Sequence, residues 1–517
     1  MAAELAALAR SIFCVGFSGT TAAAMPLAAL HAFAPGGVIL FARNVGTASE
    51  LRAAIAALRA CGDIAPLIAI DQEGGRVARI TDPALVAQLP AAMALAAAGD
   101  AASCERAGTL LGRDLARLGV SVDFAPCADL ALDARNTVIG TRSFGDAPRA
   151  VAARCAAFAR GLEAGGVAAA LKHFPGHGAT AVDSHLALPR VNVDAATLRA
   201  RDLVPFAAAI ASGAASIVMS AHIVIEAFDA AEPATLSPRI LSGLLRDELG
   251  FDGAIATDCL EMDAIAATVG TTAGAVRALA AGADLLLVSH HLERASAAAE
   301  AIAAAIERGE LPPARLQSAA ARVRRLRERY AEPAPSADVL DAQLPLDAAR
   351  RAVTVVRGDV RLQAGKPVSV ISFEGTIADG AAGSRSATPS LSAALRARRW
   401  KSELMRVALE PDAGDIDVLL AHLPTLGDRN FVLVIRRAHL YAAQRAAIER
   451  ILACVPAAIV VSAREPYDAA LFAGAHNVAC IYGDEPLSLE GCADVLSARV
   501  PAAGQLPVSL DRNVAVR

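Results

Sequence analysis

The segment from Lys172 to His185 gathers several side chains that could do chemistry. Within fourteen positions it holds three histidines, one lysine and one aspartate, with glycines and a proline that predict a loop. Asp183 and His185 lie two positions apart, so the carboxylate could bind one imidazole nitrogen within a turn. A carboxylate placed in this way orients the histidine and stabilises its protonated form, which predicts a positioned acid/base group.

The same segment has two simpler interpretations. Three histidines and an aspartate are plausible metal ligands, but Lys172 directly beside His173 would oppose a cation. The segment could also be a loop that closes one end of the fold through hydrogen bonds alone. We favour the acid/base interpretation and expect neither a metal ion nor an organic cofactor.

Asp258 is the candidate for the other half of such a reaction, because it ends an apolar run that predicts a buried strand. It could equally cap a helix that begins near Leu260, since aspartate is a favoured helix cap. The catalytic interpretation gains weight beside the histidine-rich segment, because an acid/base group needs a partner in the reaction.

Eight short apolar runs, separated by amphipathic or alanine-rich segments, predict a parallel sheet. The runs are 12–19, 37–41, 67–71, 122–126, 169–176, 216–222, 253–258 and 284–289. Eight such units predict a (β/α)8 barrel over residues 1–330, with its last helix at 313–330. Reactive side chains of a barrel lie at the carboxyl ends of its strands, and Asp71, Lys172 and Asp258 all fall at such ends.

A proline-rich linker is predicted at 331–345, and a smaller α/β sandwich domain at 346–517. Its candidate strands are 353–357, 368–373, 418–422, 431–435, 458–463 and 478–482. The domain lacks a glycine-rich nucleotide-binding motif, so we expect no nucleotide-binding role for it.

The composition of the chain argues against some classes of binding partner. The 517 residues carry a formal net charge of −4, so no basic excess exists to bind nucleic acid. Nine scattered cysteines without a Cys-x-x-Cys pair argue against a disulfide framework and favour a reducing, cytoplasmic location. The uncharged segment 203–225 is long enough to span a bilayer, but Pro205 and Gly213 predict a helix end, a turn and a buried strand. We therefore expect no membrane partner.

The motifs taken together resemble glycoside hydrolase family 3, and within it the β-N-acetylglucosaminidases of cell-wall recycling. The resemblance covers about residues 36–263 in ordered motifs. These are Gly-Gly-Val-Ile-Leu-Phe at 36–41, the stretch 71–79, Ile-Gly-Thr-Arg-Ser-Phe-Gly at 139–145, the loop 172–185 and Thr-Asp at 257–258. The Asp-Ser-His within the loop is the most specific of them. The end of the chain, 504–510, resembles the closing strand of two-domain members.

The resemblance implies a retaining enzyme that releases terminal β-linked N-acetylglucosamine from peptidoglycan fragments, either saccharides or muropeptides. Asp258 would be the nucleophile that forms a covalent glycosyl-enzyme, and His185, oriented by Asp183, would be the acid/base group. Charged side chains would hold the sugar through charge-assisted hydrogen bonds. These are Asp71, Arg79, Arg142, Lys172 and His173.

Four alternatives stay open. One is a β-glucosidase or β-xylosidase of the same family, and another is transfer of the sugar to phosphate, because a histidine acid leaves the site less negative than a carboxylate would. A third is a metal-dependent hydrolase on a barrel, although the first strand run, 12–19, contains no histidine. The fourth is a sugar-binding protein without activity, which intact Asp258, Asp183 and His185 argue against.

Overall fold

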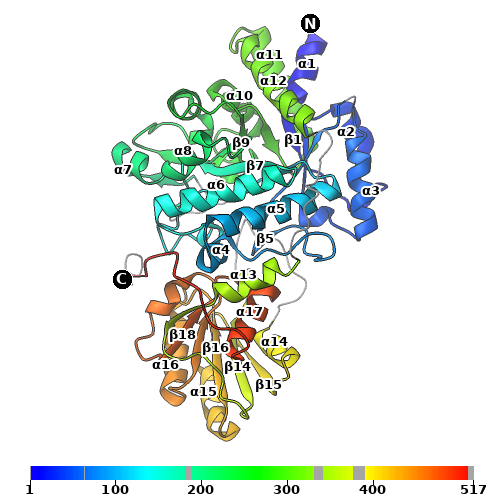
Figure 1. The fold of residues 1–517 in the computed structure, drawn as a ribbon. Helices are drawn as coiled ribbons and strands as arrows, with labels where there is room; N and C mark the ends of the chain where they lie inside the picture. Colours follow the sequence, from blue (N-terminus) through cyan, green and yellow to red (C-terminus); the bar gives the residue numbers. More distant parts are fainter. Residues whose placement is uncertain (1, 63, 181–187, 331–341, 376–389, 511–517) are drawn as a thin grey trace.

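The computed structural model consists of a barrel and a second, smaller sheet domain below it in Figure 1. The structure describes residues 2–62, 64–180, 188–330, 342–375 and 390–510. Most of the predicted linker, and both Asp183 and His185, lie outside these residues.

Eight parallel strands form the barrel in the order β11-β9-β7-β6-β3-β2-β1-β12. They are β1 (Phe13–Val15), β2 (Gly37–Leu40), β3 (Leu67–Ile70), β6 (Val122–Asp123), β7 (Ala168–Phe174), β9 (Ile217–Ser220), β11 (Ala254–Thr257) and β12 (Leu286–Val288). A bridge between Ala256 and Leu285 joins the two ends of this order, so the barrel is nearly closed. Each strand overlaps one of the eight predicted runs, which confirms the predicted barrel.

Helices cover the outside of the barrel, which is why its strands are apolar on both faces. They are α1 (Ala2–Arg10), α2 (Leu27–Phe33), α3 (Ala48–Arg59), α4 (Ala92–Ala98), α5 (Ala101–Leu118), α6 (Pro148–Ala164), α7 (Ala195–Ala200), α8 (Val204–Ala211), Arg239–Glu248, α9 (Asp263–Ala266), α10 (Thr271–Ala281), α11 (Leu292–Glu307) and α12 (Pro313–Arg329). The uncharged segment 203–225 contains α8 and β9, as predicted. No helix among the described residues is both long and apolar enough to cross a membrane.

Helices α5 and α6, which flank the strands that carry much of the site, approach each other closely through glycines. A Cβ on Gly108 would lie 2.3 Å from the carbonyl oxygen of Phe158, and one on Gly161 would lie 2.2 Å from that of Glu105. The small residues of the alanine-rich segments therefore allow backbone-to-backbone packing that larger side chains would prevent.

The second domain contains a six-stranded sheet in the order β13-β18-β17-β16-β14-β15, parallel except for the β13–β18 pair. Its strands are β13 (Thr354–Arg357), β14 (Val368–Glu374), β15 (Ser402–Ala408), β16 (Asn430–Ile435), β17 (Ile459–Ser462) and β18 (Asn477–Cys480). Its helices are α13 (Leu344–Ala352), α14 (Leu391–Ala397), α15 (Ala413–His422), α16 (Ala442–Cys454) and α17 (Pro486–Leu496). The mixed sheet with helices confirms the predicted α/β class.

One strand prediction in this domain is wrong, and one strand was missed. The run 418–422 lies in α15, whose cap is Asp412; its side chain accepts the backbone N–H groups of Gly414 and Asp415. A short apolar run alone does not distinguish a helix from a strand. The sequence analysis also missed β15, an edge strand with exposed Glu403 and Arg406 in place of a continuous apolar run.

The segment 504–510, compared above with a closing strand, forms no strand. It instead runs back to the barrel in an irregular path. The backbone N–H of Gln505 donates to the carbonyl of Ala97, and that of Asp146 donates to the carbonyl of Pro507. Ser509 donates its own backbone N–H to the Asp146 carboxylate at 2.8 Å. The end of the described chain thus ties the second domain to the barrel.

Candidate active site

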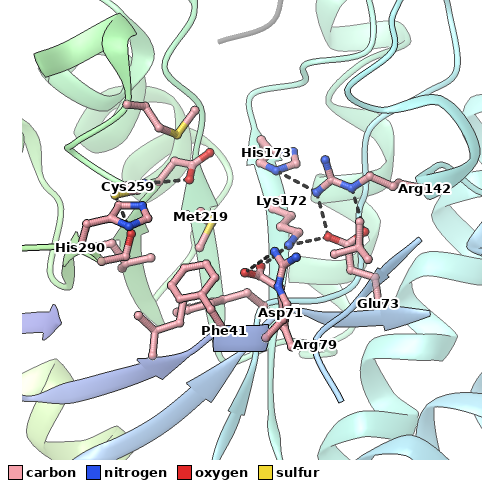
Figure 2. A pocket seen from close by; sticks show the side chains of 18 of the residues that line it. Phe41, Asp71, Glu73, Arg79, Arg142, Lys172, His173, Met219, Cys259 and His290 are labelled. Carbon is pink, nitrogen blue, oxygen red and sulfur yellow. Dashed lines mark hydrogen bonds and ion pairs between the residues drawn. The ribbon is translucent and has the colours of Figure 1, made fainter. Parts of the chain in front are cut away.

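A pocket of ≈330 Å³ opens at the carboxyl ends of the barrel strands (Figure 2). Both apolar and charged side chains line it. The apolar group includes Ile39, Phe124, Met219 and Leu287; the charged group includes Asp71, Glu73, Arg79, Arg142, Lys172 and Asp258. The pocket therefore gathers residues from β2, β7, β9 and β12 and from the segments that follow β3 and β11, as expected for a barrel.

A chain of ion pairs joins most of the predicted sugar ligands. The Lys172 ammonium lies 2.8 Å from Asp71 Oδ1 and 2.6 Å from Glu73 Oε1, and Figure 2 shows it between the two carboxylates. Arg142 donates to Glu73 through Nε at 2.9 Å and through Nη2 at 2.8 Å. Arg79 donates to Asp71 Oδ2 at 3.3 Å. The structure thus brings Asp71, Arg79, Arg142 and Lys172 together.

Glu73 belongs to this network, although the sequence analysis did not single it out. Its position two residues after Asp71, in the short strand β4 (Gln72–Gly74) that follows β3, was the available signal. The carboxylate bridges Lys172 and Arg142, so it fixes the direction of both cations. A buried charge in this position requires such partners.

The charges of the network persist at neutral pH. Burial alone would raise the pKa of both carboxyl groups. Lys172 and Arg79 instead hold the pKa of Asp71 below its ordinary range, and Arg142 and Lys172 do the same for Glu73. Burial would likewise lower the pKa of Lys172, yet Asp71 and Glu73 raise it overall. The network therefore offers carboxylates that accept and cations that donate charge-assisted hydrogen bonds to sugar hydroxyls.

His173 points one ring nitrogen into this network. Its Nδ1 lies 2.6 Å from Asp129 Oδ2, and its Nε2 lies 3.3 Å from Arg142 Nη2. Because the carboxylate accepts the Nδ1 proton, the neutral ring presents a lone pair on Nε2. The buried Asp129 therefore sets both the orientation and the tautomer of His173.

Asp129 is a site residue that the sequence analysis did not assign. Its carboxylate also accepts the backbone N–H of His173 at 3.1 Å and that of His177 at 2.6 Å. Burial alone would raise the pKa of Asp129, but His173 and His177 hold it below its ordinary value. Its place just after the fourth barrel strand was the signal in the sequence.

Among the described residues, Cys127, Asp129 and His173 are close enough together to hold a metal ion, with one ligand atom from each within 4.8 Å of the others. N–H groups and the Cys127 thiol already satisfy the Asp129 carboxylate. His177, part of the predicted histidine cluster, turns its Nδ1 to the Thr180 hydroxyl at 2.7 Å, and burial lowers its pKa to about 4. The contacts thus describe a hydrogen-bonded support for His173.

Asp258 lies in the pocket at the end of β11 and is partly exposed. Its Oδ1 accepts the backbone N–H of Cys259 at 2.7 Å. The next helix, α9, begins only at Asp263, with Met262 as its cap residue, so the helix-cap interpretation of Asp258 is wrong. Behind it, His222 Nε2 donates to the carbonyl of Cys259 at 2.9 Å and thereby holds the turn that carries Asp258.

Asp183 and His185 lie outside the described residues, so their proposed pairing stays a prediction. The described part of the same loop is well anchored. The Asn136 side chain donates to the carbonyl of His177 at 2.9 Å, and Thr180 is buried beside it. The loop thus leaves the barrel beside Asp129 and His173.

Comparisons with known proteins agree on one family. Residues 23–326 match the model of the glycosyl hydrolase family 3 N-terminal domain. The chain is 41% identical over 274 residues to a β-hexosaminidase of Methylococcus capsulatus, covering 52% of this chain and 80% of the relative. It is 42% identical over 287 residues to a β-hexosaminidase of Pseudomonas aeruginosa, covering 54% of this chain and 82% of the relative.

The likeness to a solved structure extends over both domains. A glycoside hydrolase family 3 β-N-acetylglucosaminidase from Paenibacillus sp. superposes with a TM-score of 0.90. The two sequences are 33% identical, and the match covers 99% of each chain. The second domain and its placement below the barrel are therefore shared with that enzyme.

Proposed function

Because the chain belongs to glycoside hydrolase family 3 and is a β-hexosaminidase, we propose that it is a retaining exo-β-N-acetylglucosaminidase of peptidoglycan fragments. One observation carries the proposal: Asp258 and the Asp71–Lys172–Glu73–Arg142 network line the same pocket. The network provides hydroxyl ligands, and the partly exposed carboxylate of Asp258 is available for covalent chemistry.

In the first step, an Asp258 oxygen attacks the anomeric carbon while the bond from that carbon to the leaving oxygen breaks. His185, held by Asp183, gives its proton to the leaving oxygen. In the second step, His185 takes a proton from water, the water oxygen bonds to the anomeric carbon, and Asp258 is released as a carboxylate. Two displacements at one carbon retain its configuration.

The pocket supports removal of a terminal sugar. Its ≈330 Å³ lies at the small end of the range of ligand sites, which suits one sugar ring better than a long chain. Asp71, Arg79 and Lys172 would hold hydroxyls on one side of the ring, with Arg142 and His173 beside them. The single carboxylate nucleophile lies on a different strand, so binding and bond cleavage are assigned to separate groups.

The residues at the rim of the pocket favour a substrate whose leaving group carries a carboxylate. His290 stacks on the ring of Phe41, with centroids 5.9 Å apart, on the side of the pocket away from Lys172 in Figure 2. The Arg43 guanidinium lies 4.4 Å from the same ring, and hydrogen bonds to the carbonyls of Phe17 and Ser289 hold it there. Burial lowers the pKa of His290, so the Arg43 guanidinium is the cation of this pair. Peptidoglycan fragments carry carboxylates beyond the terminal N-acetylglucosamine, and this guanidinium suits them.

The proposal includes a cytoplasmic location, where recycled fragments would reach the enzyme. All nine cysteines are free, and most of them are buried, which is compatible with a reducing compartment.

Hydrolysis of nitrophenyl β-N-acetylglucosaminide and of the corresponding β-glucoside, followed by NMR of the released sugar, tests the proposal. We expect strong preference for the first substrate, β-configured N-acetylglucosamine as the first product, and cleavage of N-acetylglucosaminyl-anhydro-N-acetylmuramic acid. Preference for the glucoside, or an α-configured first product, would overturn it. An N-acetylglucosamine 1-phosphate product in phosphate buffer would instead establish transfer to phosphate.

A further inference from the structure

Side chains from the second domain reach one segment of the barrel, residues 131–142. The residues after β16 and β17 make these contacts. Arg437 Nη2 donates to the carbonyl of Thr137 at 3.2 Å, and His439 Nε2 donates to that of Ala134 at 2.9 Å. The 131–142 segment follows β6 in the chain and leads to Arg142 of the pocket.

A buried ion pair forms the centre of this interface. Arg437 donates to Glu465 through Nε and Nη2, both at 3.0 Å, and each side chain is 2% exposed. Burial alone would raise the pKa of Glu465, but Arg437, Arg464 and Arg76 hold it below its ordinary value. One carboxylate thus interacts with three guanidinium groups, and its loss would remove the largest favourable charge interaction of Arg437.

The same interface supports the backbone that leads to the pocket. Arg76 Nη2 lies 2.8 Å from the carbonyls of Thr137 and Val138. Gly140 has φ +44°, and a Cβ there would lie 2.5 Å from Glu465 Oε1, so the Glu465 side chain lies directly against this turn. Arg142 Nη1 in turn donates to the carbonyl of Val138 at 3.1 Å. The backbone fixed by the interface therefore supports the guanidinium that faces the pocket.

A second path leads from the same segment to His173. Asn136 Oδ1 accepts the backbone N–H of Ile139, and Asn136 Nδ2 donates to the carbonyl of His177. The backbone N–H of His177 in turn donates to Asp129, which orients His173. Both side chains that end this network, Arg142 and His173, line the pocket.

We propose that the second domain positions the sugar ligands of the barrel: the Arg437–Glu465 pair, together with Arg76, holds the 131–142 segment in the conformation that presents Arg142 to substrate. This inference rests on the proposed function, because it takes Arg142 to be a sugar ligand. Arg437 and Glu465 are positioning residues, since their effect passes through the backbone of the segment.

The test is Glu465→Gln in the full chain, assayed with nitrophenyl β-N-acetylglucosaminide. A charge-assisted contact is worth about tenfold to a hundredfold in an equilibrium, and loss of ground-state sugar binding raises KM. We therefore expect KM to rise about tenfold or more, with a smaller change in kcat. Arg437→Lys keeps the charge but loses the bidentate contact, so it should also raise KM. This second variant tests the inference if Glu465→Gln does not fold.

The matched control is Asp494→Asn. Asp494 is also a buried carboxylate of the second domain, and its described partners Arg350 and Arg398, at 2.8 and 2.5 Å, belong to that domain too. We expect this variant to lower Tm and leave KM unchanged. An equal rise in KM for Asp494→Asn would mean that Glu465 acts on KM only through the stability of the domain, and it would overturn the inference.

A double-mutant cycle separates positioning from stability. In an Arg142→Ala background, Glu465→Gln should change KM less than about twofold, because the group that it positions is absent. Full additivity of the two effects, or an unchanged KM in a folded Glu465→Gln variant, would overturn the inference. If the wild-type chain did not cleave the substrate, the proposed function would fail instead.

Discussion

Asp129→Asn tests the support of the sugar-binding histidine. The Asp129 carboxylate accepts the His177 backbone N–H with Oδ1 and the Nδ1 proton of His173 with Oδ2. Asparagine replaces one of these oxygens with an NH2 group, which cannot accept either proton. One buried donor loses its partner in either orientation, or the His173 proton moves to Nε2 and faces the Arg142 guanidinium.

The free-energy cost of this substitution follows from the burial of the donor that loses its partner. An unsatisfied buried donor costs about 1–3 kcal/mol, which corresponds to about a 5- to 150-fold change in an equilibrium. If His173 binds sugar through Nε2, most of this cost appears in kcat/KM for nitrophenyl β-N-acetylglucosaminide. The nitrogen chemical shifts of the imidazole, measured by NMR, should show the change of tautomer directly.

The matched control is Asp123→Asn, at another fully buried aspartate, on β6. Burial raises the pKa of Asp123 well above its ordinary value, and its Oδ2 has no hydrogen-bond partner among the described residues. Asparagine keeps the oxygen that accepts the backbone N–H of Gln72 and removes a carboxyl group whose charged form burial disfavours, so we expect unchanged kcat/KM. A folded Asp129→Asn variant with wild-type kcat/KM and an unchanged His173 tautomer would refute the reasoning.

The two variants should also differ in the pH dependence of the free energy of unfolding. The pKa of Asp129 is lowered in the folded state, so its contribution is complete above the unfolded pKa of about 3.9 and is lost as pH falls through the folded pKa. The pKa of Asp123 is raised, so wild type loses stability as pH rises above about 3.9, and Asp123→Asn avoids that loss. Urea titrations at pH 3 to 7 measure both differences.

Three further predictions concern the reaction and its leaving group. Asp258→Ala should remove nearly all turnover, and azide should restore some as an α-configured glycosyl azide; retained wild-type turnover would contradict the nucleophile assignment. His185→Ala should lower kcat/KM about 10²–10⁴-fold for poor leaving groups and much less for nitrophenol, and equal losses would contradict the acid role. Arg43→Ala should raise KM for an aglycone that carries a carboxylate several-fold more than for a neutral one; equal effects would exclude an electrostatic contact.

The sequence predicted the barrel well because a parallel sheet covered on both sides needs continuous apolar strands. The eight runs stand out against the amphipathic or alanine-rich helices around them, and their order in the chain is also their order around the barrel. In the second domain the same rule failed at β15, because an edge strand contacts the sheet on one side only and exposes Glu403 and Arg406.

The site was predictable where a residue's type and strand-end position sufficed. Asp71 and Asp258 directly follow strands that the apolar runs had located, and Lys172 lies near the carboxyl end of another, β7. Glu73 and Asp129 were missed because their roles depend on which loops lie side by side. Contacts from the second domain were harder still to predict from the sequence, because Arg437 and Thr137 are 300 positions apart in the chain.

Burial alone does not decide which carboxyl groups of the barrel are charged. Asp71, Glu73 and Asp123 belong to neighbouring strands or the loop between them, and burial raises the pKa of each. Lys172, on β7, lies 2.8 Å from Asp71 and 2.6 Å from Glu73, and it contributes no hydrogen bond to Asp123 among the described contacts. The neighbouring cations therefore hold the pKa values of Asp71 and Glu73 below the ordinary range, whereas burial keeps the pKa of Asp123, within the wall, well above it.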